Sequence, residues 1–556
     1  MSASIPNHES VSQLERDCLD ALEKRGSKIQ SLHPHQLTAI HELLSGNSVF
    51  QRVQTGGGKT LVVILLVLLR QDYPNKYRSG KILAFFPTLA LIQDTKRRLS
   101  DYGISCWTSP SNENSYTNGL SRASSCVISE PDEKTSSNIS QVDVVLSTGE
   151  FWASSSPKAQ AARNVVAREE NRIIWIDEAD TAVITSKTYR PSQSMLGDMP
   201  GVYAPAPVLF SSATFTEILL KEAVMFYKSK HAKFVQTQAD RQNLKVKRLD
   251  AADMKAAKGV VYEQIEDLLC FVAHSPNERT DQAIIFVRSH KDVDDMCAYL
   301  KGLSPTKLID RYHAEMLSKE KKKILKNFAS LKTRVLVVTL ASFAAGMDYP
   351  NVRSVYLLNI PESVEQFWQA IGRAGRDGKP ASVYLFASLT DTAKALAESQ
   401  PSSHYAIRIV LRAFGVSSRC RLKETLEYID GINSTTSCGH CDLCEGFSSH
   451  DAHKRVHSLL NSVQYPEQPQ RTLDLAVREF DEDTIRASLE MGTLCVHFDQ
   501  HIQNKKKLIL SVSTDDAAQQ RLRESCVEPL WIYLAKGGAP RGESTEPKKR
   551  QKRGHT

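Results

Sequence analysis

Residues 53–60 read VQTGGGKT and combine three glycines with a lysine and a threonine. Glycines let backbone N–H groups close on anionic oxygens, a lysine reaches terminal phosphates, and a hydroxyl can hold Mg²⁺. The segment therefore predicts a phosphate-binding loop for a nucleotide, although Val53 stands where such loops usually have their first glycine. Its candidate binding residues are Thr55, Gly56, Gly57, Gly58, Lys59 and Thr60.

Carboxylates follow an apolar run further along the chain. Residues 173–176 are Ile-Ile-Trp-Ile, and Asp177 and Glu178 come directly after them. The carboxyl ends of parallel strands line the ligand crevice of an α/β sheet. We therefore expect Asp177 to hold Mg²⁺ together with Thr60, and Glu178 to polarise an attacking water.

Two further features suit a nucleoside triphosphate. Gln36 precedes Lys59 by 23 residues, and its amide offers the donor and the acceptor needed to read an adenine edge, although a solvent-facing glutamine is the simpler alternative. Residues 369–378 read QAIGRAGRDG, with Arg373 and Arg376 three positions apart. Guanidinium groups so spaced share one face of a helical turn and can neutralise the charge that develops on a γ-phosphate.

The chain contains 11 cysteines, and four of them form one cluster. Seventeen residues separate Cys420 from Cys438, and Cys441 and Cys444 follow in the order CGHCDLC. Four thiolates with this spacing predict a structural Zn²⁺ site, with His440 as a bystander. Scattered cysteines elsewhere favour a reducing compartment over a disulfide framework.

Short apolar runs alternate with helical patterns through most of the chain. Runs without polar interruptions are typical of strands buried on both faces of a parallel sheet. The sequence therefore predicts an α/β protein with two parallel-sheet lobes, of which only the first carries a phosphate loop, so that nucleotide binds at their seam. The predicted strands are Ile82–Phe86, 142–146, 173–176 and 208–210, and then 283–287, Val335–Thr339 and 355–358.

Length and charge limit the remaining possibilities. A chain of 556 residues exceeds what one core can organise, and its net charge of +8 favours a polyanionic partner. The N-terminus lacks a secretory pattern and no apolar run is long enough to span a bilayer, so we expect a cytosolic or nuclear protein. The segment 547–553, PKKRQKR, fits a nuclear import signal, a phosphate-contacting tail or a solvated end.

Together these motifs resemble the RecQ family of DNA helicases in helicase superfamily 2. The resemblance covers residues 31–445 in the family's order. It rests on Gln36, QTGGGKT (54–60), PTLALIQD (87–94), the acidic motif at Asp177, SSAT (211–214), DRQN (240–243), YHAEM (312–316), ASFAAGMDYPNVR (341–353), QAIGRAGRDG and the cysteine cluster.

The resemblance implies two RecA-like lobes that bind ATP and Mg²⁺ between them and move 3′ to 5′ along single-stranded DNA. It makes Arg373 and Arg376 arginine fingers and brings Asp348 and Gln369 near the nucleotide. It further implies duplex unwinding of tailed DNA in nuclear DNA repair or recombination. The expected units are an extension (1–30), an ATP-binding lobe (31–228), a second lobe (229–400), a zinc-binding module (401–445), a region of unassigned fold (446–536) and a disordered basic tail (537–556).

The sequence also departs from the family. Ile184 and Thr185 stand where an aromatic-rich loop usually has Gln and Trp, and a β-branched pair cannot stack on a base. Asp180 replaces a histidine and is expected to pair with Ser212 or Thr214. Residues 446–536 match no winged helix. These departures leave a first alternative, an ATP-modulated DNA-binding protein that has lost unwinding. The lobe motifs leave a second alternative, a DEAD-box-type RNA helicase, but the zinc module argues against it.

Overall fold

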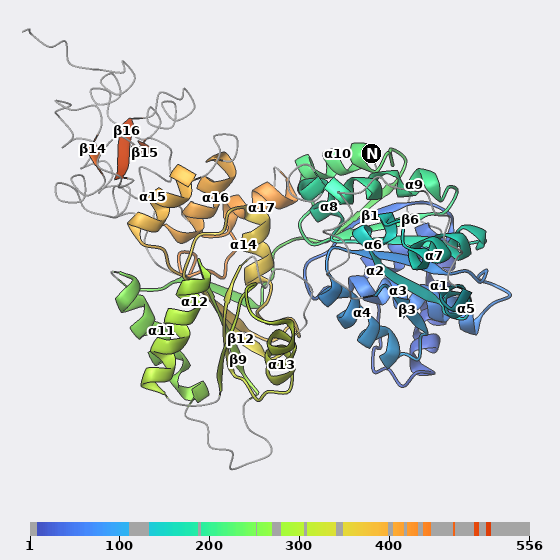
Figure 1. The fold of residues 1–556 in the computed structure, drawn as a ribbon, viewed down its shortest axis with the longest axis horizontal. Helices are drawn as coiled ribbons and strands as arrows, with labels where there is room; N and C mark the ends of the chain where they lie inside the picture. Colours follow the sequence, from blue (N-terminus) through green and yellow to red (C-terminus); the bar gives the residue numbers. More distant parts are fainter. Residues whose placement is uncertain are drawn as a thin grey trace, which may run out of the picture.

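The computed structural model describes residues 8–110, 133–186, 191–251, 253–269, 280–304, 308–340, 349–398, 404–415, 420–431, 437–445, 471–472, 494–499 and 507–512. These residues form two lobes built on parallel sheets, a small helical unit that packs on lobe 2 and reaches toward lobe 1, and an antiparallel sheet (Figure 1). The two-lobe α/β architecture predicted from the apolar runs is confirmed. No helix in the described part of the chain has the length and apolar character needed to cross a membrane.

Lobe 1 contains a seven-stranded sheet in the order β3-β4-β2-β5-β6-β1-β7, with all neighbours parallel. Its strands are β1 (Val49–Arg52), β2 (Ile82–Phe86), β3 (Cys106–Thr108), β4 (Val144–Thr148), β5 (Ile173–Asp177), β6 (Val208–Ser212) and β7 (Lys233–Gln236). Its helices are α1 (His8–Glu23), α2 (Pro34–Leu44), α3 (Lys59–Asp72), α4 (Leu89–Asp101), α5 (Glu133–Ser140), α6 (Gly149–Ala153), α7 (Pro157–Arg168), α8 (Ala179–Ser186), η2 (Pro191–Asp198), α9 (Met199–Val202) and α10 (Glu217–Phe226).

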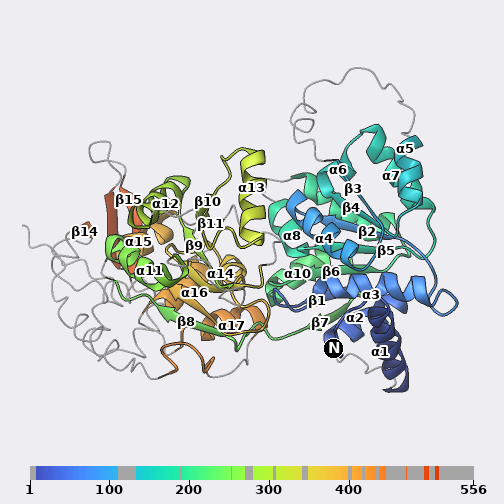
Figure 2. The same ribbon diagram turned by 90° about the horizontal axis from the view of Figure 1, so that it is seen from below.

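Each face of this sheet is covered by its own group of helices (Figures 1 and 2). One apolar cluster joins α1, α2, α3 and α4 to the sheet, and the other joins α7, α8 and α10 to the opposite face. The strands are buried on both sides, which explains their continuous apolar runs. Lobe 1 is larger than its predicted bounds of 31–228, because α1 shares its core and β7 pairs with β1.

Lobe 2 contains a six-stranded parallel sheet in the order β10-β11-β9-β12-β13-β8. Its strands are β8 (Leu244–Arg248), β9 (Gln282–Val287), β10 (Ile309–Tyr312), β11 (Val335–Thr339), β12 (Val352–Leu357) and β13 (Ala381–Leu385). Its helices are α11 (Met254–Leu269), α12 (His290–Leu303), α13 (Ser318–Ala329), α14 (Val364–Ile371) and α15 (Leu389–Glu398). The strands predicted in both lobes are confirmed, with ends that differ by up to three residues.

The unit that follows lobe 2, here the cysteine module, consists of α16 (His404–Phe414), α17 (Lys423–Asp430) and the segment 437–445. Its apolar side chains belong to the same cluster as one face of the lobe 2 sheet, so module and lobe share a core. In Figure 1 the orange helix α17 reaches from above α14 toward α10 of lobe 1.

Within the region for which no fold was predicted, the described residues form a three-stranded antiparallel sheet. Its strands are β14 (Arg471–Thr472), β15 (Leu494–Asp499) and β16 (Lys507–Val512). β15 and β16 lie beside α15 of lobe 2. The predicted disordered tail, 537–556, lies outside the described residues.

Candidate functional site

The predicted phosphate loop connects β1 to α3. Its first residue continues the sheet, because the Val53 amide donates to the Ser212 carbonyl over 3.0 Å. Gly58 caps α3 with a φ of +83°, a conformation that favours glycine, and Lys59 is the first residue of the helix. The departure at Val53 has a packing explanation, since a Cβ on Gly57 would lie 2.5 Å from Val53 Cγ1. The valine therefore fills the space beneath the loop.

The side chain of Gln36 contacts the phosphate loop. Its Nε2 donates to the Gly58 carbonyl over 3.2 Å, and its Oε1 accepts from the His33 amide over 2.9 Å. His33 and Gln36 together form the capping box of α2, and Gln36 is buried. In this structure both ends of the amide are engaged by the protein, so the side chain positions the loop.

Asp177 and Glu178 lie at the carboxyl end of β5, next to the phosphate loop. Ser211 Oγ donates to Asp177 Oδ1 over 2.7 Å. Burial raises the pKa of Asp177 to about 6, the Glu178 charge adds to the rise, and the nearby Lys59 charge opposes it. Glu178 has a φ of +48°, and its buried Oε2 has no hydrogen-bond partner among the described residues. A residue at a strand end with a strained backbone and a buried carboxylate oxygen that lacks a partner is a candidate for proton chemistry.

The neighbouring Asp180 contacts the segment that ends β6. Thr214 Oγ1 donates to Asp180 Oδ2, and Ser212 Oγ accepts from the Thr214 amide over 2.9 Å. Burial raises the pKa of Asp180 to about 6. The expected pairing of Asp180 with this segment is confirmed, and it links the acidic motif to the strand beside the phosphate loop.

The phosphate loop of lobe 1 meets lobe 2 directly. Thr55 Oγ1 donates to the Gly372 carbonyl over 3.1 Å. A Cβ on Gly56 would lie 3.2 Å from the carbonyl oxygen of Arg376 and 3.6 Å from its Cβ. Arg376 is therefore adjacent to the loop, as the seam prediction requires, across more than 300 residues of sequence.

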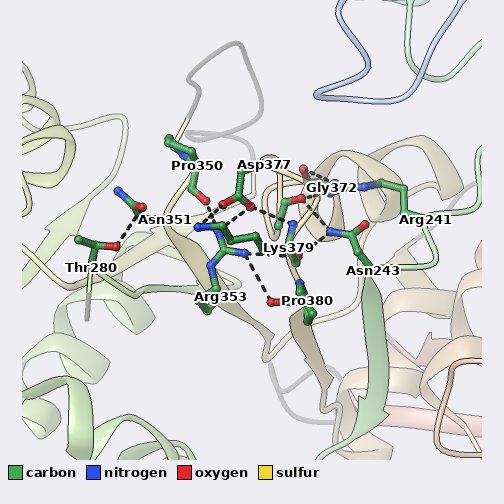
Figure 3. A network of polar contacts seen from close by, with 11 residues as sticks. Arg241, Asn243, Thr280, Pro350, Asn351, Arg353, Gly372, Asp377, Lys379 and Pro380 are labelled. Atoms are coloured by element: carbon green, nitrogen blue, oxygen red, sulfur yellow. Dashed lines mark hydrogen bonds and ion pairs between the residues drawn. The ribbon is translucent and has the colours of Figure 1, made fainter. Parts of the chain in front are cut away.

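Polar contacts fix residues 372–379, which carry Arg373 and Arg376 and are here called the arginine turn (Figure 3). Asn243 Nδ2 donates to the carbonyls of Gly375 and Lys379, each over 2.8 Å. Arg241 donates to the carbonyls of Gly372, over 3.1 Å, and Gly375. Burial and the charge of Arg376 lower the pKa of Arg241 to about 10.

The turn is also held from the opposite side, where Arg353 pairs with Asp377 over 2.7 Å. Sequence reasoning assigned no role to Arg241, Asn243 or Arg353. The motifs DRQN and ASFAAGMDYPNVR, which contain these residues, were the available signal.

Arg373 is buried in the same seam. Burial raises the pKa of Tyr349. The charge of Arg373 opposes this rise, and the charge of Asp94, in α4 of lobe 1, adds to it. Tyr349, Arg373 and Asp94 therefore lie in one region. Gln369 is half-buried on α14. Asp348 lies outside the described residues.

Four cysteines converge in the cysteine module. The sulfurs of Cys420, Cys438, Cys441 and Cys444 all lie within 4.8 Å of one another. Cys441 Sγ lies 3.4 Å from Cys444 Sγ, and Cys438 Sγ lies 3.9 Å from Cys444 Sγ. Tetrahedral Zn–S bonds of about 2.3 Å place sulfurs roughly 3.8 Å apart. The four side chains therefore fit a tetrahedral metal site.

His440 points away from this cluster. Its Nδ1 is 2.6 Å from the Leu244 carbonyl oxygen and its Nε2 is 2.8 Å from Asp240 Oδ1. The backbone around Cys441 pairs with Val246 of the edge strand β8, where the Asp442 amide donates to the Val246 carbonyl over 3.0 Å. Both ring nitrogens of His440 are thus engaged by lobe 2, which agrees with its prediction as a bystander.

The region expected to carry an aromatic loop is helical up to residue 186. Ile184 and Thr185 lie in α8, where Ile184 is 45% exposed and Thr185 is buried. Residues 187–190, which include Tyr189, lie outside the described residues.

Comparison with protein families gives two successive matches along the chain. Residues 33–221 match the DEAD/DEAH box helicase family, and residues 261–378 match the helicase conserved C-terminal domain. The first match contains the phosphate loop and the acidic motif, and the second contains the arginine turn. The matched segments thus lie on opposite sides of the seam.

Individual proteins agree with these matches. An ATP-dependent DNA helicase of Schizosaccharomyces pombe, hus2/rqh1, is 26% identical over 75% of this chain and 30% of its own length. The ATP-dependent DNA helicase RecQ of Haemophilus influenzae is 25% identical over 75% of this chain and 61% of its own length. The chain thus spans about one third to three fifths of these relatives.

A solved structure is similar in fold. The Mycobacterium smegmatis helicase Lhr, bound to single-stranded DNA and AMP-PNP, has a TM-score of 0.53 at 16% identity, over 95% of this chain and 63% of its own. The two parallel-sheet lobes are therefore RecA-like. Because helicase motifs lie on both sides of the seam and the relatives include a RecQ helicase, the chain belongs to the RecQ family of superfamily 2 helicases.

Proposed function

We propose that the protein is an ATP-dependent 3′–5′ DNA helicase of RecQ type, which couples ATP hydrolysis to movement along single-stranded DNA and to duplex unwinding. The observation that carries the proposal is the contact between Gly56 of the phosphate loop and Arg376 of the opposite lobe. A site divided between two lobes can convert a change at the bound phosphates into a movement of one lobe against the other.

Residues of lobe 1 bind and orient the nucleotide in this proposal. The loop amides and Lys59 hold the phosphates, and Thr60 and Asp177 hold Mg²⁺, which when bound supplies positive charge to the phosphate oxygens. Glu178 accepts a proton from the attacking water, for which its buried, unpaired Oε2 is suited. Gln36 keeps the loop in place, and its contact with adenine remains a prediction.

Lobe 2 completes the site with Arg373, Arg376 and Gln369, and with Asp348 from outside the described residues. The arginine turn is held by Arg241 and Asn243, so the guanidinium of Arg376 is presented from a fixed backbone. A cation oriented in this way stabilises charge on the γ-phosphate without reorganisation.

A Zn²⁺ ion held by Cys420, Cys438, Cys441 and Cys444 is part of the proposal. The ion would be structural, because all four positions are protein thiolates and none is left for a substrate. Zinc would fix the segment 437–445 against β8, and so join the module to lobe 2.

DNA as the partner is supported by the names of the relatives, which are DNA helicases. The net charge of +8 agrees with a polyanionic partner. The 3′–5′ direction, action in DNA repair or recombination and a nuclear location rest on the family resemblance.

A strand-displacement assay tests the proposal. The protein is expected to separate a duplex with a 3′ single-stranded tail when ATP and Mg²⁺ are present, and to leave a 5′-tailed duplex intact. Lys59→Ala and Glu178→Gln should each abolish displacement and ATP turnover, while His231→Asn, a change at an exposed position outside the site, should not.

The other outcomes separate the alternatives. DNA binding without displacement, and without a response to ATP, would indicate a DNA-binding protein that has lost unwinding. Stimulation of ATP hydrolysis by RNA but not by DNA would indicate an RNA helicase.

A further inference from the structure

A second cluster of metal-ligating side chains lies in lobe 2, away from the cysteines. His290 is the first residue of α12, while His313 and Glu315 belong to the loop that follows β10. Each offers one ligand atom, and these three atoms all lie within 4.8 Å of one another. His290 Nδ1 is 3.1 Å from Glu315 Oε1, and the two imidazole rings stack with centroids 4.9 Å apart.

His313 is the unusual member of this cluster. The residue is 7% exposed, and its two ring nitrogens are buried without a hydrogen-bond partner among the described residues. A buried polar group without a partner is costly, so such a group in a native fold indicates an interaction that the protein alone does not supply. Asp294 Oδ1, at 3.6 Å from His313 Nε2, is too distant for a hydrogen bond and already pairs with Arg311.

The backbone holds two of these elements in place. Ser289 and Asp292 form a capping box, in which Ser289 Oγ accepts from the Asp292 amide over 3.2 Å, and this fixes the start of α12 beside His290. His313 and Glu315 lie on one turn, in which the Met316 amide donates to the His313 carbonyl over 3.3 Å.

We propose that His290, His313 and Glu315 bind a divalent transition-metal ion, Zn²⁺ in the first instance. Two imidazole nitrogens and one carboxylate oxygen are a donor set that suits Zn²⁺ and not Mg²⁺ or Ca²⁺. Tetrahedral ligands of this kind lie roughly 3.4 Å apart. Closing the site therefore requires small rotations of the more exposed His290 and Glu315 side chains toward the buried His313.

The ion would join the start of α12 to the loop that follows β10. His290 also lines a cavity of about 710 Å³, whose walls include Arg288, Thr339 and Asn359. The fourth ligand position would be open, since three protein ligands leave one for water or for an anionic oxygen. The site differs from the proposed Cys420 cluster in its ligand atoms, which are nitrogen and oxygen and not sulfur, and it uses different residues.

The metal content of the protein tests the proposal. The protein of 556 residues, free of any tag, is dialysed against micromolar Zn²⁺ with millimolar Mg²⁺, and bound zinc is counted by mass spectrometry. Two zinc ions per chain are expected. His290→Asn and Glu315→Gln should each reduce the count to one, whereas the matched exposed changes His231→Asn and Glu320→Gln should leave two.

Cobalt distinguishes the two sites, because thiolate ligands give intense charge-transfer absorption and nitrogen and oxygen ligands do not. Glu315→Gln should remove one Co²⁺ per chain with no loss of the thiolate absorption. Added Zn²⁺ should also raise the melting temperature of the wild type more than that of Glu315→Gln. An equal zinc count in Glu315→Gln and Glu320→Gln would overturn the proposal.

Discussion

Replacement of Arg52 by methionine tests the contact that joins lobe 1 to the cysteine module. Arg52 ends β1, three residues before Thr55, and its Nη2 lies 2.8 Å from Asp430 Oδ1 at the end of α17. The two side chains are 5% and 11% exposed. Arg52 also donates to Gln236 Oε1 over 2.8 Å and to the carbonyl of Ile429.

The magnitude follows from what the substitution leaves behind. Methionine fills a similar volume, so the main loss is the positive charge opposite a buried carboxylate. Asp430 then keeps only the Ala239 amide, at 3.1 Å, among the donors described for it. Removing one member of a buried ion pair costs about 3–5 kcal/mol. Arg52→Met should therefore lower the free energy of unfolding by about that amount at pH 8.

The loss should depend on pH in a defined direction. Burial raises the pKa of Asp430, and the Arg52 charge opposes that rise, so Arg52→Met raises the pKa further. An acid whose folded pKa exceeds its unfolded value destabilises the fold at high pH, and the cost disappears as the pH falls through the folded pKa. The deficit should therefore be smaller at pH 5 than at pH 8.

Urea denaturation followed by circular dichroism measures the deficit, and hydrogen exchange locates it at α17. The double variant Arg52→Met, Asp430→Leu removes both charges and should recover part of the loss, which gives a coupling of about 0.5–3 kcal/mol. Lys221→Met, which breaks an exposed ion pair with Glu217, is the control and should change stability by less than about 1 kcal/mol. A deficit below about 1 kcal/mol for Arg52→Met, or one independent of pH, would refute the reasoning.

Three further substitutions, the first with a matched control, give expected outcomes. Gly58→Ala would place a Cβ 2.3 Å from Gln36 Nε2 at a φ of +83°, so binding of a fluorescent ATP analogue should weaken more than tenfold. Gly103→Ala, at a φ of +71° with open space around it, should leave binding unchanged. Thr214→Val removes the hydroxyl that donates to buried Asp180, and urea denaturation should show a loss of about 1.5–3 kcal/mol. Cys441→Ser should lower bound zinc and the melting temperature while ATP-analogue binding persists, and unchanged zinc would contradict a structural site.

Much of lobe 1 could be predicted from local pattern. Strands buried on both faces, such as Ile82–Phe86, have unbroken apolar sequences, and they were predicted correctly. The strands that were missed are short or carry polar residues, among them β1 (Val49–Arg52) and the edge strand β8 (Leu244–Arg248). An edge strand is less buried, so apolar and polar residues alternate along it. In a short segment this alternation does not distinguish a strand from other structures.

The sequence by itself determined the residues able to do chemistry, because glycine loops, paired acids and cysteine spacing are local requirements of phosphate and metal binding. It did not determine which of these groups meet. The approach of Gly56 to Arg376, the support of the arginine turn by Asn243 and the pairing of Arg52 with Asp430 join positions more than 100 residues apart. Only the packing of the two lobes and the module decides such contacts, because side chains on separate elements face each other through tertiary structure and leave no periodic signal in the chain.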